Sequence, residues 1–255
     1  MKNVFNKVAA AATLLMGVAS TANAFVVLTM TDLSTATTVT CNTFIGGCGA
    51  GFSVLNANFV NFSGTVGAFD VASTQGLSNA PGTALVASAN TTSLTVNRND
   101  FALGTKGLVV SFVVFDFFSP TGTSKTMQGS ASTTAGQGFF NSATESIFTN
   151  FRVDSDNTTN LLIASGTVSQ SSCSMATALN NSCNAGSIVW SDPALGVAGF
   201  SSRTQQVFTL EAASIVNTTS SLTIRNVPEP MTLSLVGVSL LGLAFASRRR
   251  AAAKA

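Results

Sequence analysis

Histidine is absent from this chain of 255 residues, and charged side chains make up only 9% of it. The lack of histidine removes the commonest general base, so nucleophile–histidine catalysis is excluded. It also removes one of the two usual ligands of structural zinc. Serine is plentiful, but nothing in the sequence indicates a group that would activate it. We therefore expect no enzymatic activity, and no metal or cofactor site is predicted.

The few charges are unevenly placed along the chain. Lys2 and Lys7 lie near the N-terminus, and Arg248-Arg249-Arg250 and Lys254 lie near the C-terminus. Between them, residues 25–230 carry six Lys and Arg against ten Asp and Glu, which is a net charge of −4. Nucleic-acid binding depends on clustered cations that face phosphate. This acidic, charge-poor body is therefore not predicted to bind nucleic acid.

The first 24 residues have the layout of a secretory signal peptide. Lys2 and Lys7 precede a largely apolar stretch at 8–18, and Ala22-Asn23-Ala24 has the small-x-small form that signal peptidases cut. We predict cleavage after Ala24, so that the mature chain begins at Phe25. The alternative is an uncleaved anchor, but this apolar stretch is shorter than the ~20 residues that span a bilayer.

Four cysteines fall as two close pairs, Cys41 with Cys48 and Cys173 with Cys183. An even number of cysteines in an exported protein indicates disulfides. Three connectivities are possible, and we predict local pairing because it closes two short loops rich in Gly, Asn and Ser. Zinc binding is the alternative, but both spacings are wider than the usual C-x(2–4)-C and histidine is missing.

Residues 25–226 are rich in Ser, Thr, Asn, Gly, Val and Phe, which is the composition of strands joined by polar turns. Apolar and polar residues alternate at 93–97, 208–211 and 222–225. We find no linker and no convincing repeat. The sequence thus predicts one all-β body, an antiparallel β-sandwich or jelly-roll-like fold.

One segment of this body, 108–118, is apolar at odd and even positions alike, except at Ser111 and Asp116. Such a run is typical of a central strand that is covered on two sides. Turn signals such as Ala80-Pro81-Gly82 and 154–157 separate the predicted strands.

The chain changes character at 227–255. Val227-Pro228-Glu229-Pro230 favours extended backbone, and residues 231–246 are mostly apolar before Arg248-Arg249-Arg250. As a helix, 231–246 reaches ~24 Å, and snorkelling arginines would extend it toward the ~30 Å of a hydrocarbon core. A cationic end lies on the cytoplasmic side of a membrane, so the body is expected outside.

This three-part tail resembles the PEP-CTERM sorting signal, which is also described as the C-terminal domain of ice-binding proteins. Pro228-Glu229-Pro230 is the signature, 231–246 is the hydrophobic helix, and 248–255 is the basic end. The preceding 222–227 looks like the final strand typical of such proteins. The resemblance implies recognition by an exosortase, a membrane-embedded cysteine transpeptidase of Gram-negative bacteria. It implies that the body is released, or transferred to the envelope or exopolysaccharide matrix, after cleavage near the motif.

Two other interpretations of the tail are a plain single-span anchor and a glycolipid-anchor signal. A plain anchor does not require Pro228-Glu229-Pro230 at its outer boundary. A glycolipid signal normally ends in its hydrophobic segment and would not add Arg248-Arg249-Arg250.

Paired carboxylates could hydrolyse a glycosidic bond, and the available acids are Asp70, Asp100, Asp116, Glu145, Asp192 and Glu211. Asp116 draws attention because it lies in an apolar run, although a hydrogen-bonded structural role is favoured. A Ser-Lys pair would have to use Lys106 or Lys125. Asp154-x-Asp156 resembles the opening of a calcium loop, but Thr159 and Ser165 replace the expected Gly and Glu, so a turn is favoured.

The leading hypothesis is an exported structural or adhesive protein of exopolysaccharide or biofilm, processed by an exosortase and held transiently in the inner membrane by its C-terminal helix. The first alternative is a carbohydrate-binding module or a glycoside-acting enzyme. The second is an ice- or surface-binding protein, suggested by the second name of the tail and by Thr-rich strands.

Overall fold

The computed structural model describes residues 25–80, 82, 86–118, 120, 125–135, 145–154, 169–175, 181–192, 199–226 and 237–240. Most of them belong to strands, so the prediction of an all-β body is confirmed. The strands are β1 Val26–Asp32, β2 Thr37–Asn42, β3 Gly47–Cys48, β4 Phe52–Asn56, β5 Phe59–Val66, β6 Phe69–Ser78, β7 Val86–Arg98, β8 Lys106–Phe117, β9 Lys125–Ala135, β10 Glu145–Asp154, β11 Ser169–Met175, β12 Asn181–Asp192, β13 Phe200–Leu210 and β14 Ile215–Asn226.

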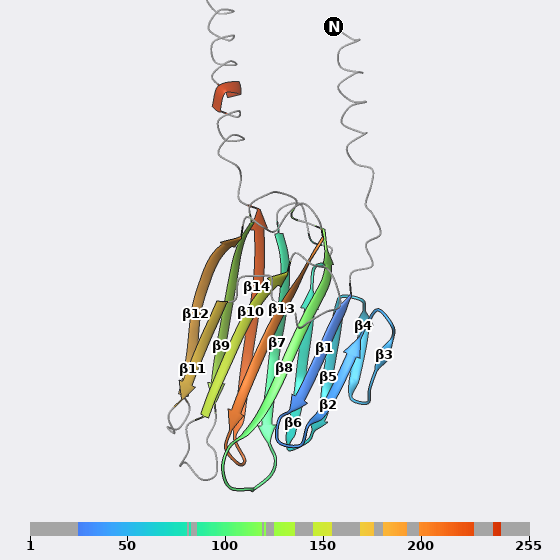
Figure 1. Cartoon of the computed structure of the whole chain (residues 1–255), viewed down its shortest axis with the longest axis vertical. Coiled ribbons are helices and arrows are strands. Elements are labelled where there is room, and N and C mark those ends of the chain that lie inside the picture. The colour runs from blue at the N-terminus through green and yellow to red at the C-terminus, as the bar shows by residue number, and fades with distance from the viewer. Residues whose placement is uncertain are drawn as a thin grey trace, which may run out of the picture.

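These strands form two antiparallel sheets that lie face to face (Figure 1). Sheet A has the order β11-β10-β13-β8-β1-β2-β3, and sheet B has the order β12-β9-β14-β7-β6-β5-β4. The chain crosses between the sheets after β3, after β7 and several times later, which ties the two layers into one β-sandwich. The first strand begins and the last strand ends at the same end of the sandwich (Figure 1).

The core lies between the sheets and follows from alternation along each strand. In β14, Val216, Leu222 and Ile224 are buried, whereas Ile215 and Asn217 on the opposite face are exposed. Successive side chains of a strand point to opposite faces, so each apolar residue at a second position reaches the core. Phenylalanine supplies most of the bulk, and the largest fully buried rings are Phe62, Phe69, Phe112, Phe115, Phe117, Phe151, Phe200 and Phe208.

Strand β8 is central in sheet A, between β13 and β1, as its sequence predicts. Its first half alternates, with Leu108 and Val110 buried and Val109 half-buried. From Phe112 through Phe115 every side chain is buried, so only this second half is covered on both faces.

A buried carboxylate connects the two sheets where β1 ends. Asp32 Oδ1 accepts hydrogen bonds from the backbone N–H (2.7 Å) and the hydroxyl (2.6 Å) of Ser34 in the β1–β2 turn. Its Oδ2 accepts one from the N–H of Ala68 (2.8 Å) in the turn between β5 and β6 of sheet B. Gly67 has φ +58°, and a Cβ there would lie 2.0 Å from Asp32 Oδ2. Only glycine leaves room for this junction.

The predicted tail helix, 231–246, lies outside the described residues except for 237–240, which form one helical turn. No helix among the described residues is long and apolar enough to span a bilayer. The signal peptide and the motif at 227–230 also lie outside the described part of the chain, so both stay predictions.

Candidate functional site

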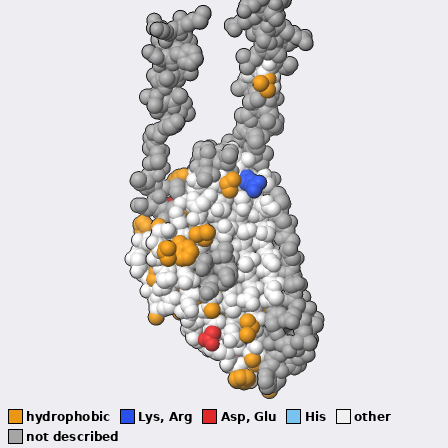
Figure 2. Space-filling view, turned by 180° about the vertical axis from the view of Figure 1, so that it is seen from behind, with side chains coloured by type: hydrophobic (Ala, Val, Ile, Leu, Met, Phe, Trp, Pro, Cys, Tyr) orange, Lys and Arg blue, Asp and Glu red, His pale blue; other side chains and the backbone are white. Residues whose placement is uncertain are grey.

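A hollow on the outer face of sheet B is the candidate site that the described residues present. Its volume is about 380 Å³, and it crosses the three neighbouring strands β7, β14 and β9. The lining consists of Asn90, Thr91, Ser130, Ala131, Ser132, Thr219, Ser220 and Ser221. Figure 2 views the molecule from the side of this face, and most of its described surface is white, which marks backbone and side chains that are neither charged nor apolar.

The outward residues reach the hollow because small polar residues occupy every second position of β9 and β14. Ser130 and Ser132 alternate with buried Met127, Ala131 and Thr133 on β9. The hydroxyl groups of Ser130 and Ser221 are hydrogen-bonded to each other across β9 and β14 (2.7 Å). Short side chains leave the strand surface open, and each hydroxyl can both donate and accept a hydrogen bond.

The floor of the hollow lies where the pairing of β14 with β7 changes register between Thr218 and Ser220. Such an irregularity twists the strand locally and opens the ladder. The inward hydroxyls of Thr91 and Ser220 are buried and hydrogen-bonded to each other at this point. The floor therefore has its own polar contacts and does not depend on a bound molecule.

Beneath the floor, the interior of the sandwich is polar. Thr218 Oγ1 accepts hydrogen bonds from Gln206 Nε2 of the opposite sheet (3.0 Å) and from Thr133 Oγ1 (3.1 Å). On β13, Ser202 Oγ, Thr204 Oγ1 and Gln206 Oε1 are buried without a hydrogen-bond partner. The interior of the sandwich is therefore polar at this level and apolar around Phe208, Leu222 and Ile224.

Two ion pairs among the described residues lie at the end of the sandwich away from the tail. Arg98 is fully buried there, where its Nε donates to Asp100 Oδ1 (2.6 Å) and its Nη atoms donate to the carbonyls of Ala102 (2.6 Å) and Leu210 (2.9 Å). Lys106 forms an ion pair with the same carboxylate of Asp100. Burial opposes ionisation of Asp100, but the hydrogen bonds from Lys106 and Arg98 hold its pKa below 3.8. The hollow on sheet B is left without a charged side chain in its lining.

A second hydroxyl-bearing surface lies on the outer face of β1 and β2 in sheet A. Thr29 pairs with Thr40 and Thr31 with Thr38, and each pair is joined by a hydroxyl–hydroxyl hydrogen bond of 3.3 and 3.0 Å respectively. We call these four residues the threonine array. It has two rungs, and its continuation along β1 is Val27, which is apolar.

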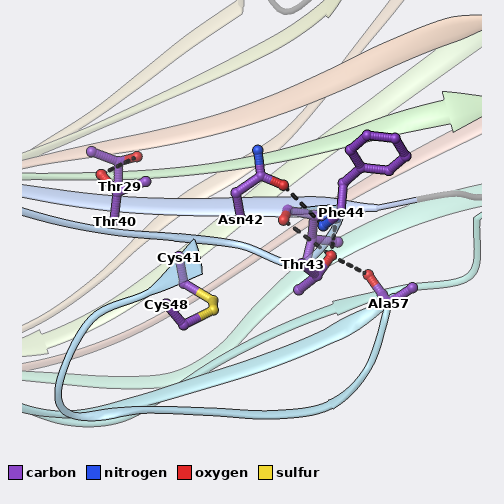
Figure 3. Close-up of a disulfide and its surroundings, with 9 residues drawn as sticks. Thr29, Thr40, Cys41, Asn42, Thr43, Phe44, Cys48 and Ala57 are labelled. Carbon is purple, nitrogen blue, oxygen red and sulfur yellow. Dashed lines mark hydrogen bonds between the residues drawn. A yellow bond between two sulfur atoms is a disulfide. The ribbon is translucent and has the colours of Figure 1, made fainter. Parts of the chain in front are cut away.

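The predicted disulfide between Cys41 and Cys48 is present next to this array and joins β2 to β3 (Figure 3). The turn between the two cysteines is further held by Asn42, whose Oδ1 accepts a hydrogen bond from the N–H of Phe44 (2.9 Å). Cys173 and Cys183 belong to β11 and β12, but their side chains lie outside the described part, and so do Trp190 and its surroundings.

The candidate catalytic carboxylates occupy separate structural positions. Asp70 Oδ1 accepts a hydrogen bond from Thr65 Oγ1 (2.7 Å) on the neighbouring strand. Asp100 is held by Arg98 and Lys106, and Glu211 is buried in the turn between β13 and β14. The side chains of Glu145 and Asp192, and the calcium-like segment 155–165, lie outside the described residues.

Asp116 has φ +61°, which is the left-handed region. It stands where the pairing of β8 with β13 slips between Phe200 and Ser202, so it is the extra residue of a β-bulge. Aspartate tolerates this conformation better than the apolar residues around it. The backbone conformation therefore accounts for an aspartate in this apolar run, which agrees with the favoured structural interpretation.

Both candidate lysines have side-chain contacts that do not suit a general base. Lys106 is paired with Asp100, and Lys125 lies buried with Nζ 5.4 Å from the centre of the Phe200 ring. Burial lowers the pKa of Lys125. Within the described ranges, no group of three or more Asp, Glu or Cys could hold a metal ion.

Sequence reasoning missed the hollow because serine and threonine are common throughout the body. The available signal was the repetition of hydroxyl residues at alternate positions in both 130–134 and 219–223. The pairing of β9 with β14, which sets these runs side by side, is visible only in the structure.

Comparisons with known proteins add little to this geometry. No family model and no curated protein matches the sequence. One solved structure with a similar arrangement is TmCBM61, a carbohydrate-binding module, in complex with β-1,4-galactotriose. It is 9% identical over 62% of this chain and 88% of that chain, with a TM-score of 0.30. A likeness at that level supports no conclusion about ligand or family, so the function has to be argued from the site itself.

Proposed function

We propose that this protein is an exported envelope or matrix protein that adheres to neutral polysaccharide through the hollow on sheet B. The observation that carries the proposal is the lining of the hollow, which apart from Ala131 is made of small hydroxyl and amide side chains and contains no charge. Neutral sugars present closely spaced hydroxyls that donate and accept hydrogen bonds, as do Ser, Thr and Asn.

The expected strength of such binding is low for a single site. A hydrogen bond exchanged with water contributes about 0.5–1.5 kcal/mol, and the described lining offers no aromatic ring on which a sugar could stack. A long polysaccharide repeats its units, so many weakly bound copies of the protein give strong retention. Weak, repeated contacts suit adhesion in a matrix better than the tight capture of one small sugar.

The tail supplies the other half of the proposal. The arrangement at 227–255 supports delivery through the inner membrane and processing near Pro228-Glu229-Pro230 by an exosortase. The body would then reach the envelope or the exopolysaccharide matrix of a Gram-negative bacterium. In this proposal the protein has no catalytic role.

A sedimentation assay with insoluble cellulose tests the adhesive role, with insoluble calcium alginate as the acidic comparison. Ser132→Leu/Thr219→Leu fills the hollow from two exposed positions and is expected to lower the bound fraction at least fivefold. The matched control is Thr38→Leu/Thr40→Leu on the outer face of sheet A, which should bind normally. Equal binding by both variants would refute the site.

Reducing sugar is measured in the same tubes. Release of reducing ends by the wild-type protein would show a glycoside-acting enzyme instead of an adhesive one.

The threonine array favours a second candidate, an ice- or surface-binding protein. It presents four hydroxyls in two rungs at the strand spacing of ~4.8 Å. The same two variants distinguish this candidate: inhibition of ice recrystallisation should be lost in Thr38→Leu/Thr40→Leu and retained in Ser132→Leu/Thr219→Leu.

A further inference from the structure

Three large apolar side chains are exposed close together at the β3–β4 edge of the sandwich, two in a turn and one near the end of β4. Phe44 and Ile45 in the β2–β3 turn are 63% and 70% exposed, and Leu55 near the β4–β5 turn is 78% exposed. We call these residues the apolar shoulder. The turns are fixed to each other, because Thr43 Oγ1 donates a hydrogen bond to the carbonyl of Ala57 (2.9 Å; Figure 3).

The shoulder lies in a stretch of the chain without charge. No Asp, Glu, Lys, Arg or Pro occurs from Leu33 through Phe69. Large apolar side chains that gather on a surface mark a site of contact with a protein or a membrane. Phe44 and Ile45 project from a turn and Leu55 from the irregular end of β4, so they do not form a flat sheet face. This shape suits insertion between lipid molecules better than the packing of two flat protein surfaces.

Strand pairing shows that the shoulder is on the half of the body from which the tail leaves. The N–H of Ser78 donates to the carbonyl of Asn58 in the β4–β5 turn (3.0 Å). Ser78 in turn pairs with Ala89, and Ala89 pairs with Leu222. The turn is therefore level with Leu222, four residues before the end of β14 at Asn226.

The tail sets how far the body can be from a membrane. Only residues 227–230 separate the end of β14 from the apolar segment 231–246, and four residues span at most ~14 Å. The shoulder lies about 13 Å below the end of β14 and four strand spacings, about 19 Å, to its side. If the body tilts by roughly 35° toward the β3–β4 edge, the shoulder and the end of β14 lie at the same height above the membrane.

We propose that, while the tail is in the membrane, the apolar shoulder Phe44, Ile45 and Leu55 rests in the lipid surface and holds the body tilted. This inference rests on the proposed membrane insertion of the tail. The second contact would fix the height of Pro228-Glu229-Pro230 above the bilayer, where a membrane-embedded transpeptidase acts. Cleavage leaves the shoulder as a weak, reversible contact, because a few side chains alone do not anchor a protein.

Tryptophan fluorescence in vesicles tests this contact with the full chain. Leu55→Trp and, as a matched control at the far end, Leu103→Trp (84% exposed) are reconstituted into phosphatidylcholine vesicles. Brominated phosphatidylcholine, which quenches tryptophan on contact, then replaces the ordinary lipid. The emission of the unsubstituted protein, which comes from Trp190, is subtracted from that of each variant.

The added emission of Leu55→Trp is expected to fall at least twofold with brominated lipid, and that of Leu103→Trp is expected to stay unchanged. Equal quenching of the two variants would overturn the inference. A blue-shifted emission of Leu55→Trp without quenching would also overturn it, because the shoulder would then be covered by a second copy of the protein.

Flotation of the vesicles distinguishes a failure of the tail to insert from a failure of the shoulder to touch the lipid. Protein that does not float with the vesicles refutes the membrane role of the tail, whereas protein that floats without quenching refutes only the shoulder.

Discussion

At the scale of single residues, Asp32 is the described side chain with the clearest structural task. Burial opposes ionisation of its carboxyl group, but hydrogen bonds from Ser34 and from the N–H of Ala68 outweigh burial and lower its pKa from 3.8 to about 2. Replacing it by alanine removes these bonds and leaves the Ala68 N–H unpaired. We expect Asp32→Ala to lower the free energy of unfolding by about 2 kcal/mol, measured by urea denaturation near pH 7.

The pH dependence has a definite sign. A carboxyl group whose pKa falls on folding stabilises the protein fully above 3.8, and this stabilisation is lost as the pH falls toward about 2. The unfolding free energy of Asp32→Asn should therefore change less with pH in this window than that of the wild type. Parallel curves for Asp32→Asn and wild type would contradict the assignment.

The polar interior gives a pair of opposite predictions. Thr204 Oγ1 is buried without a partner, so Thr204→Val removes an unsatisfied hydroxyl and should raise the unfolding free energy by about 1 kcal/mol. Thr218 Oγ1 accepts hydrogen bonds from Gln206 and Thr133, so Thr218→Val should lower the unfolding free energy by about 1–3 kcal/mol. Urea titrations with unchanged slope measure both. A loss of stability in Thr204→Val would show that its hydroxyl is bonded to water.

At the scale of elements, the bulge of β8 decides what residue can follow Phe115. Asp116 has φ +61°, a conformation that costs a β-branched residue about 1–2 kcal/mol or more. Asp116→Val should therefore be destabilised by at least that amount, whereas Asp116→Asn should be nearly neutral, as seen in thermal unfolding curves. If both variants are as stable as the wild type but both lose a polysaccharide-cleaving activity that the wild type has, Asp116 would be catalytic and not structural.

At the scale of the whole molecule, export, anchoring and processing are expected to depend on separate segments. Changing Pro228-Glu229-Pro230 to Ala-Ala-Ala leaves the signal peptide and 231–246 intact. We expect normal export but no processing, so that the protein accumulates in the membrane with its tail attached. Immunoblots against the tail and against the body, on membrane and extracellular fractions of a strain with an exosortase, measure this.

A plain anchor makes a different forecast. Its retention depends on the apolar span and on Arg248-Arg249-Arg250, and it is indifferent to the motif. Identical fractionation of mutant and wild type, both with uncleaved tails, would leave the plain anchor as the explanation.

The sequence alone determined the fold class and one disulfide. Alternation at 93–97, 208–211 and 222–225 predicted strands that the structure places in β7, β13 and β14, because a period of two can bury only one face of a strand. Cys41 and Cys48 are close enough in sequence for one turn to bring them together. Both inferences needed only local information.

Tertiary structure decided the candidate site. The hollow requires β9, β14 and β7 to be neighbours, although 86–98 and 215–226 are far apart in the chain. Strand order depends on which pairings bury the most apolar surface, and many serine-rich strands have the same alternation. The junction of Asp32 with Ala68 and the tail-side position of the apolar shoulder likewise depend on contacts between distant segments, which no local pattern in the sequence specifies.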